Sequence, residues 1–201
     1  MITIDQMRHF APHGIPWIMQ AIADTSAVAL PKGQITTRLR LQHFMAVIYE
    51  ETGGFTEIEE NLNYSAARAH VVWPHRFLSI ASAMPYAHNP HLLANLVYGG
   101  RMGNNLPQDG WMYRGQGLIQ STGKGTYIRL GKALGLDLVA TPAMLTSREH
   151  MLECAAVNYM LCGAITAADR DDLTTETERV NGGLTNMPAR IDALKRAKAV
   201  F

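Results

Sequence analysis

The sequence predicts a mainly α-helical protein with at most a small β element. Apolar residues recur at helical spacing in several segments, and capping residues and glycines bound these segments. Only one stretch is typical of extended chain. The chain has 201 residues, of which 47% are hydrophobic and 17% charged, a balance that is ordinary for a globular protein with a sizeable core. We therefore expect residues 1–201 to form a single domain with no separate binding module.

The strongest helical signal in the first half of the chain is "TTRLRLQHFMAVIYEETGG" at 36–54. Gly53 and Gly54 mark where this helix ends. Its apolar face is formed by Leu41, Phe44, Met45 and Ile48. Shorter helices are expected in three other places: 4–10, 15–24 and 65–73.

The second half predicts five more helices, at 89–100, 125–134, 146–163, 174–183 and 186–200. The first of them opens with Asn89, a favoured capping residue, followed by Pro90. The third is expected to begin after a cap at Thr146 or Ser147 and to end at Gly163.

The best non-helical stretch is "WMYRGQGLIQSTG" at 111–123, which is rich in glycine and apolar residues. It predicts a short strand or an extended loop. The whole connection from Tyr98 to Ile119 is long for a mere link, and long loops in compact domains are often functional.

Charge and composition exclude several classes of protein. The formal net charge is +1, so no overall field favours nucleic acid. No run of 18 apolar residues predicts a transmembrane helix, and the N-terminal residues do not have the pattern of a Sec signal peptide. Cys154 and Cys162 are separated by about 12 Å of helix rise, too far for a disulfide, so we expect two buried thiols.

Common cofactor and metal motifs are also missing. "GQGLIQ" begins like a dinucleotide-binding loop, but Gln120 occupies the third glycine position and no βαβ context surrounds it. The eight histidines form no HExxH motif, and Ser121 lies in no GxSxG elbow. We therefore expect neither a metal nor a cofactor.

Five glutamates lie within eleven positions, at Glu50, Glu51, Glu57, Glu59 and Glu60. Glu51 falls in the last turn of the predicted helix, where the helix dipole disfavours an ionised carboxylate. The chain reversal at the two glycines can bring a second carboxylate back toward it. Two opposed carboxylates suit glycoside hydrolysis, whereas a solvated acidic rim is the alternative.

The sequence resembles glycoside hydrolase family 19, in particular its short phage-endolysin branch. The matching stretches are "FMAVIYEETGGFTEIEENLNYSA", "RMGNN", "DGWMYRGQGLIQSTGKGTY", "ALGLDLVATPAML" and "RVNGGLTNMPAR", in this order between about residues 44 and 190. The resemblance implies the mostly helical, lysozyme-like fold of that family. It also implies one catalytic glycoside hydrolase domain over 1–201.

The resemblance further implies roles for individual residues. Glu51 takes the place of the general acid, Glu60 that of the carboxylate that activates water, and Thr122 that of the hydroxyl that helps hold this water. Five further residues take the places of amides, substrate contacts and a cleft arginine in the family: Asn63, Tyr64, Gln120, Asn181 and Arg190. Glu50, Glu57 and Glu59 are expected to be solvated or structural.

Two residues depart from the family pattern. Glu50 replaces the usual histidine before the acid, and Gln116 replaces the usual arginine between the two glycines. Both changes remove positive charge near the cleft. We expect them to make the acid harder to ionise or to change how substrate is held.

These observations predict an endolysin that hydrolyses β-1,4 bonds of peptidoglycan with inversion, as a monomer, for host lysis. We expect it to be made in the host cytoplasm without a signal peptide and to reach the periplasm through a membrane lesion. Its expected partners are peptidoglycan glycan strands, with no nucleic acid and no stable membrane insertion. Three alternatives stay open: an endochitinase, a non-catalytic glycan-binding module, and a secreted antibacterial toxin with an immunity partner. The basic last helix also leaves open a contact with anionic membrane.

Overall fold

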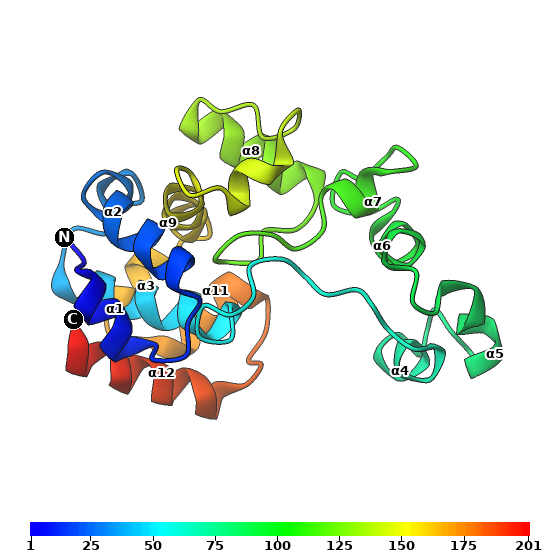
Figure 1. The fold of residues 1–201 in the computed structure, drawn as a ribbon, viewed down its shortest axis with the longest axis horizontal. Coiled ribbons are helices and arrows are strands. Elements are labelled where there is room, and N and C mark those ends of the chain that lie inside the picture. Colours follow the sequence, from blue (N-terminus) through cyan, green and yellow to red (C-terminus); the bar gives the residue numbers. More distant parts are fainter.

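The computed structural model describes residues 1–201 and contains twelve α-helices, two 3₁₀ helices and no extended strand (Figure 1). The predicted mainly α class is therefore confirmed. None of the helices combines the length and the apolar composition that crossing a lipid bilayer requires.

The main body is built from seven helices: α1 (Ile4–Phe10), α2 (Pro16–Lys32), α3 (Arg38–Glu51), α9 (Met151–Leu161), α10 (Ala164–Ala168), α11 (Leu173–Asn181) and α12 (Met187–Val200). They enclose a core of 31 buried hydrophobic residues. Helix α3 packs against α12, and α2 packs against α9. The predicted apolar face of α3 is confirmed, because Phe44, Met45 and Ile48 are fully buried.

Residues 61–112 form a separate group of short elements, which we call the small lobe. It contains α4 (Ala66–Val72), α5 (Ile80–Ala83), the 3₁₀ helix η1 (Met84–Tyr86), α6 (Pro90–Tyr98) and α7 (Asp109–Met112). These elements have their own apolar cluster, centred on Phe77, Leu93 and Val97. Figure 1 shows the small lobe extending to one side of the main body, with α5 at its far end.

A third cluster joins α8 (Lys124–Leu134) and the 3₁₀ helix η2 (Pro142–Thr146) to α9. Tyr113 and Tyr127 are its largest buried members and pack edge to face, with ring centroids 5.1 Å apart.

The predicted small β element is present in the stretch that looked non-helical. Two antiparallel bridges pair Glu59 with Gln116 and Gln116 with Ser121. The Glu60 amide donates to the Gly115 carbonyl at 2.9 Å, and the Ser121 amide donates to the Gln116 carbonyl at 2.8 Å. This short ladder brings the acidic segment beside the loop that follows α7.

Some helix boundaries differ from those predicted. Helix α2 continues to Lys32, beyond residue 24, because Ala29 and Leu30 are also buried in the core. Helix α9 begins at Met151 and has no side-chain cap, since Pro142–Thr146 forms a separate 3₁₀ turn. Thr146 and Ser147 are therefore not its caps.

The two cysteines are free thiols, as expected. Cys154 is buried and Cys162 is partly buried at the end of α9. Burial raises the pKa of the Cys154 thiol to about 12, which keeps it protonated and unreactive.

Candidate functional site

The largest cleft has a volume of about 640 Å³ and lies where the main body meets the small lobe. Ten residues line it: Glu51, Glu57, Glu59, Glu60, Asn61, Asn63, Tyr64, Ser65, Arg68 and Gln120. Only one of them is hydrophobic. Such a lining offers hydrogen bonds rather than apolar contact, which suits a polymer rich in hydroxyl and amide groups.

Local backbone geometry explains why several glutamates gather here. Helix α3 ends at Glu51, and Gly53 and Gly54 follow with φ values of 56° and 77°. Glycine adopts this left-handed backbone without steric cost, so the chain can reverse directly after Glu51. The segment then runs along the edge of the ladder and returns Glu60 to the same cleft.

Glu51 is held by two donors from distant helices. The Arg190 Nη2 donates to its Oε1 at 2.7 Å, and the Asn181 Nδ2 donates to the same atom at 2.9 Å. Arg190 is buried in α12, and its Nε donates to the Thr185 carbonyl at 3.0 Å. A full positive charge therefore faces Glu51 at the negative end of the α3 dipole. This places the predicted Arg190 and Asn181 directly at the predicted acid.

Glu60 is held by a different pair of donors. The Tyr98 hydroxyl donates to its Oε1 at 2.6 Å, and the Gly115 amide lies 3.3 Å from its Oε2. Burial and the neighbouring Glu60 carboxylate raise the pKa of the Tyr98 phenol well above its usual value. The phenol therefore stays a hydrogen-bond donor to Glu60 at every pH at which the protein would act. Sequence patterns gave no sign of Tyr98, because it lies 38 residues away on α6.

Thr122 lies beside the cleft rather than in its lining. Its hydroxyl donates to the Gln120 carbonyl at 3.0 Å. It lines a neighbouring pocket of about 350 Å³, which also contains Gln120 and Asn181. Gln120 belongs to both pockets and so connects Thr122 to the cleft.

Asn63 and Tyr64 line the cleft from the side of the small lobe. The Asn63 side chain is hydrogen-bonded to the His88 ring at 2.9 Å. Tyr64 packs edge to face against Trp73, with ring centroids 5.0 Å apart. The structure thus brings these two predicted contacts to the same cleft as Glu51 and Glu60.

The two departures from the family pattern have different surroundings. Glu50 accepts a hydrogen bond from Asn186, at the start of α12. Gln116 is buried in the ladder, where its backbone pairs on both sides. Positive charge beside this part of the cleft comes instead from Arg114, which pairs with the cleft residue Glu59.

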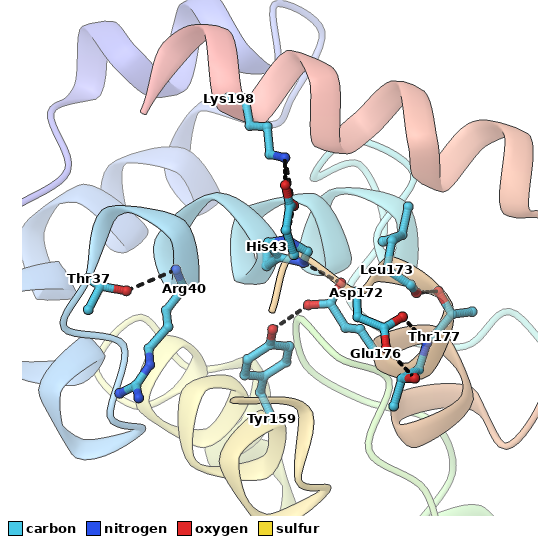
Figure 2. Close-up of polar contacts among 11 residues, drawn as sticks. Thr37, Arg40, His43, Tyr159, Asp172, Leu173, Glu176, Thr177 and Lys198 are labelled. Carbon is cyan, nitrogen blue, oxygen red and sulfur yellow. Dashed lines mark hydrogen bonds and ion pairs between the residues drawn. The ribbon is translucent and has the colours of Figure 1, made fainter. Parts of the chain in front are cut away.

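A buried charge cluster lies outside the cleft, among the helices that support it (Figure 2). His43 of α3 is fully buried, with Nδ1 2.8 Å from Glu176 and Nε2 2.8 Å from Asp171. Glu176 also accepts from the Tyr159 hydroxyl, and Lys198 pairs with Asp171 at 2.6 Å. Because both ring nitrogens face carboxylates, the imidazolium form satisfies both contacts.

The charge state of His43 follows from two opposing effects. Burial alone lowers the pKa of His43, but the hydrogen bonds and negative charges of Glu176 and Asp171 outweigh burial and raise this pKa above its usual value. The cluster joins α3, which carries Glu51, to α11 and α12, which carry Asn181 and Arg190. It therefore ties together the three helices that hold Glu51 and its donors.

No group of three or more His, Cys, Asp or Glu side chains is arranged to hold a metal ion. What the structure does provide is two carboxylates, Glu51 and Glu60, that line one polar cleft, each with its own donors. Glycoside hydrolases use a pair of carboxylates of this kind, and the mainly helical fold is compatible with that class.

Comparison with known proteins gives the family. No protein-family model matches the chain. A family 19 glycosyl hydrolase domain-containing protein of Haemophilus influenzae is 33% identical over 192 residues, which cover 94% of this chain and 92% of that protein. The chain therefore belongs to glycoside hydrolase family 19 and is a glycoside hydrolase.

Solved structures agree on the fold. A bacterial family 19 chitinase matches with a TM-score of 0.61 and 20% identity, over 99% of this chain and 94% of that one. Chitinase C from Streptomyces griseus matches with a TM-score of 0.58 and 18% identity, over 99% of this chain and 76% of that one. The predicted lysozyme-like helical fold of family 19 is thus confirmed.

Proposed function

We propose that this protein is an endolysin that hydrolyses β-1,4 glycosidic bonds of peptidoglycan by an inverting acid–base mechanism. The observation that carries the proposal is the placement of Glu51 and Glu60 in one polar cleft, on separate chain segments and with separate donors. Residues 1–201 act as one catalytic domain, because the main body supplies the donors of Glu51 and the small lobe supplies Tyr98. The protein acts as a monomer at the cell wall, which it reaches through a membrane lesion.

In this mechanism Glu51 gives its proton to the glycosidic oxygen as the bond to the anomeric carbon breaks. Glu60 takes a proton from a water molecule, whose oxygen attacks that carbon from the opposite face. The reaction leaves Glu51 ionised and Glu60 protonated, and solvent restores both. Thr122 orients the water once its hydroxyl turns away from the Gln120 carbonyl. Gln120, Asn63 and Tyr64 hold the sugar units.

Arg68 supports peptidoglycan over chitin as the substrate. Its side chain lines the cleft from α4 and forms no ion pair within the protein. Peptidoglycan carries carboxylates on its lactyl and peptide groups, whereas chitin is neutral. An unpaired guanidinium in the cleft favours the anionic polymer.

Endochitinase activity is the second candidate, because the two solved structures compared above are chitinases. A paired assay separates the two. Equal enzyme is given to chloroform-treated Gram-negative cells and to colloidal chitin, and reducing ends are counted. We expect faster release from the cells. Faster release from chitin with little clearing of the cells would favour the chitinase.

Replacing Arg68 tests the substrate preference within the cleft. We expect Arg68→Gln to lower turnover of peptidoglycan roughly fivefold, the effect of losing one exposed charge contact, and to leave turnover of chitin oligosaccharides unchanged. Arg148→Gln, which removes an arginine packed over Trp17, is the control and should affect neither. An equal loss on both substrates would mean that Arg68 does not bind the carboxylates that distinguish peptidoglycan from chitin.

The position of Glu60 predicts the consequence of removing its donor. Tyr98→Phe should lower kcat roughly tenfold with little change in KM, because a hydrogen bond to a charged group contributes about 1.5–3 kcal/mol. Tyr86→Phe, a packed tyrosine of the same lobe, is the matched control. Full activity of the Tyr98 variant would show that Glu60 needs no orientation by this phenol.

The stereochemistry of the product tests the role of Glu60. Inverting carboxylates stand roughly 6.5–9.5 Å apart and leave room for water, whereas retaining pairs stand about 5–5.5 Å apart. In the proposed mechanism Glu60 lies on a segment separate from Glu51 and activates a water between them, so proton NMR of a fresh digest should show the α-anomer first. An initial excess of the β-anomer would make Glu60 a nucleophile instead.

A further inference from the structure

The far end of the small lobe exposes several large apolar side chains. Leu78 is 87% exposed, Ile80 51% and Met84 62%. We call these three residues the α5 tip. Ile80 and Met84 are four positions apart around a helical turn, so they lie on the same side of it. No other part of the protein buries these three side chains, and Figure 1 places α5 at the extreme end of the molecule.

The small lobe around this tip is also cationic. Residues 61–108 contain no Asp or Glu, although the whole chain has 17. The same stretch contains Arg68, Arg76 and Arg101 and four histidines. None of the three arginines forms an ion pair. The near-neutral net charge of the protein therefore conceals a small lobe in which three arginines outnumber a single acidic residue, Asp109, which is already paired with Lys124.

We propose that the α5 tip binds peripherally to anionic lipid surfaces. Leu78, Ile80 and Met84 would enter the boundary between headgroups and acyl chains, and Arg76 would pair with lipid phosphate. The tip joins three exposed apolar side chains to a stretch whose only ionisable cations are arginines and histidines, and an anionic bilayer complements both features. A soluble polyanion would leave the apolar groups in water, and a second copy of the chain would bring like charges together.

The last helix is less suited to this task than its composition indicated. Its cations already have partners within the protein: Arg190 pairs with Glu51, Lys195 with Asp192 and Lys198 with Asp171. The Arg196 guanidinium lies over the Tyr49 ring, 5.2 Å from its centroid. The membrane contact considered for this helix is therefore better placed at the α5 tip.

The tip and the cleft use different residues. None of Leu78, Ile80 and Met84 lines the cleft, and Figure 1 shows α5 at the end of the small lobe away from the main body. The enzyme could thus rest on a membrane and still hold a glycan strand. This inference does not depend on which glycan the protein cleaves.

Vesicle sedimentation of the full chain tests the proposal. We expect the wild type to bind phosphatidylglycerol vesicles, to bind phosphatidylcholine vesicles weakly, and to lose binding as salt is raised. Leu78→Ser/Met84→Ser should weaken binding to phosphatidylglycerol at least tenfold, since two apolar side chains no longer leave water. Arg76→Gln should weaken it several-fold and reduce its dependence on salt.

The matched control is Val28→Ser/Ile128→Ser, which alters two side chains of similar exposure, 68% and 53%, on α2 and α8, outside the small lobe. It should bind like the wild type. All variants should keep native circular dichroism and normal activity on soluble glycan fragments. Absence of wild-type binding to phosphatidylglycerol, or equal losses in the tip and control variants, would overturn the proposal. The proposal would also be overturned if light scattering showed that the wild type is a dimer and that Leu78→Ser/Met84→Ser makes it dissociate.

Discussion

Glu51→Gln should reduce hydrolysis by roughly 10²–10⁴-fold, the range typical of a positioned general acid. The change is nearly isosteric, and the new amide oxygen can still accept from Arg190 and Asn181. The variant therefore loses the transferable proton while keeping its donors. Reducing-end assays on purified peptidoglycan measure the loss, and circular dichroism should remain native.

The matched control for this variant is Glu50→Gln. Glu50 is the preceding residue of the same helix, but its carboxylate bonds to Asn186 and does not line the cleft. We expect it to retain most activity. Turbidity clearing by Glu51→Gln at the wild-type rate would remove Glu51 from the mechanism, and equal losses in both variants would indicate a general effect of charge.

His43→Gln should destabilise the fold by about 3–5 kcal/mol, because removing one partner of a buried ion pair leaves the other charge uncompensated. Glu176 is fully buried and would lose the imidazolium that faces it. For a domain of this size the expected fall in Tm is roughly 10 °C. Thermal unfolding followed by circular dichroism measures it. Lys195→Gln, which breaks an exposed pair with Asp192, should melt like the wild type.

The same histidine predicts a dependence of stability on pH. The folded-state pKa of His43 is raised above its unfolded value of 6.5. Its contribution is therefore complete below pH 6.5 and is lost as pH rises through the folded-state pKa. The Tm of the wild type should fall from neutral toward alkaline pH, and that of His43→Gln should fall less. Parallel curves for the two proteins would show that His43 is not charged in the fold.

Much of the fold could be predicted from local sequence. Helical spacing, the Gly53–Gly54 stop and the glycine-rich stretch before Thr122 are signals within a few residues, and they correctly placed α3 and the small β element. Short elements such as α7 and α10 escaped prediction because four or five residues carry no periodicity. The start of α9 was misplaced because a proline-led 3₁₀ turn competes with helix capping.

The candidate site, like the fold, could be predicted only where its signals are local in the sequence. The helix end at Glu51 and the family motifs predicted Glu51 and Glu60 as the reactive pair, and the structure brings both to one cleft. Their catalytic roles stay a prediction. The contacts of these two residues could not be read from spacing, since Arg190 lies 139 residues from Glu51 and Tyr98 lies 38 from Glu60. His43 matched no motif in the sequence, and its carboxylate partners lie more than 120 residues away.

The hydrogen bond between Tyr98 and Glu60 has a mechanical consequence. Glu51 is hydrogen-bonded by residues of main-body helices, whereas Glu60 is hydrogen-bonded by Tyr98, the last residue of α6 in the small lobe. The ladder holds the Glu60 backbone through Gly115, but the direction of its carboxylate depends on Tyr98. The gap between the two carboxylates, which decides whether a water molecule fits, therefore depends on how the small lobe packs as well as on the main body.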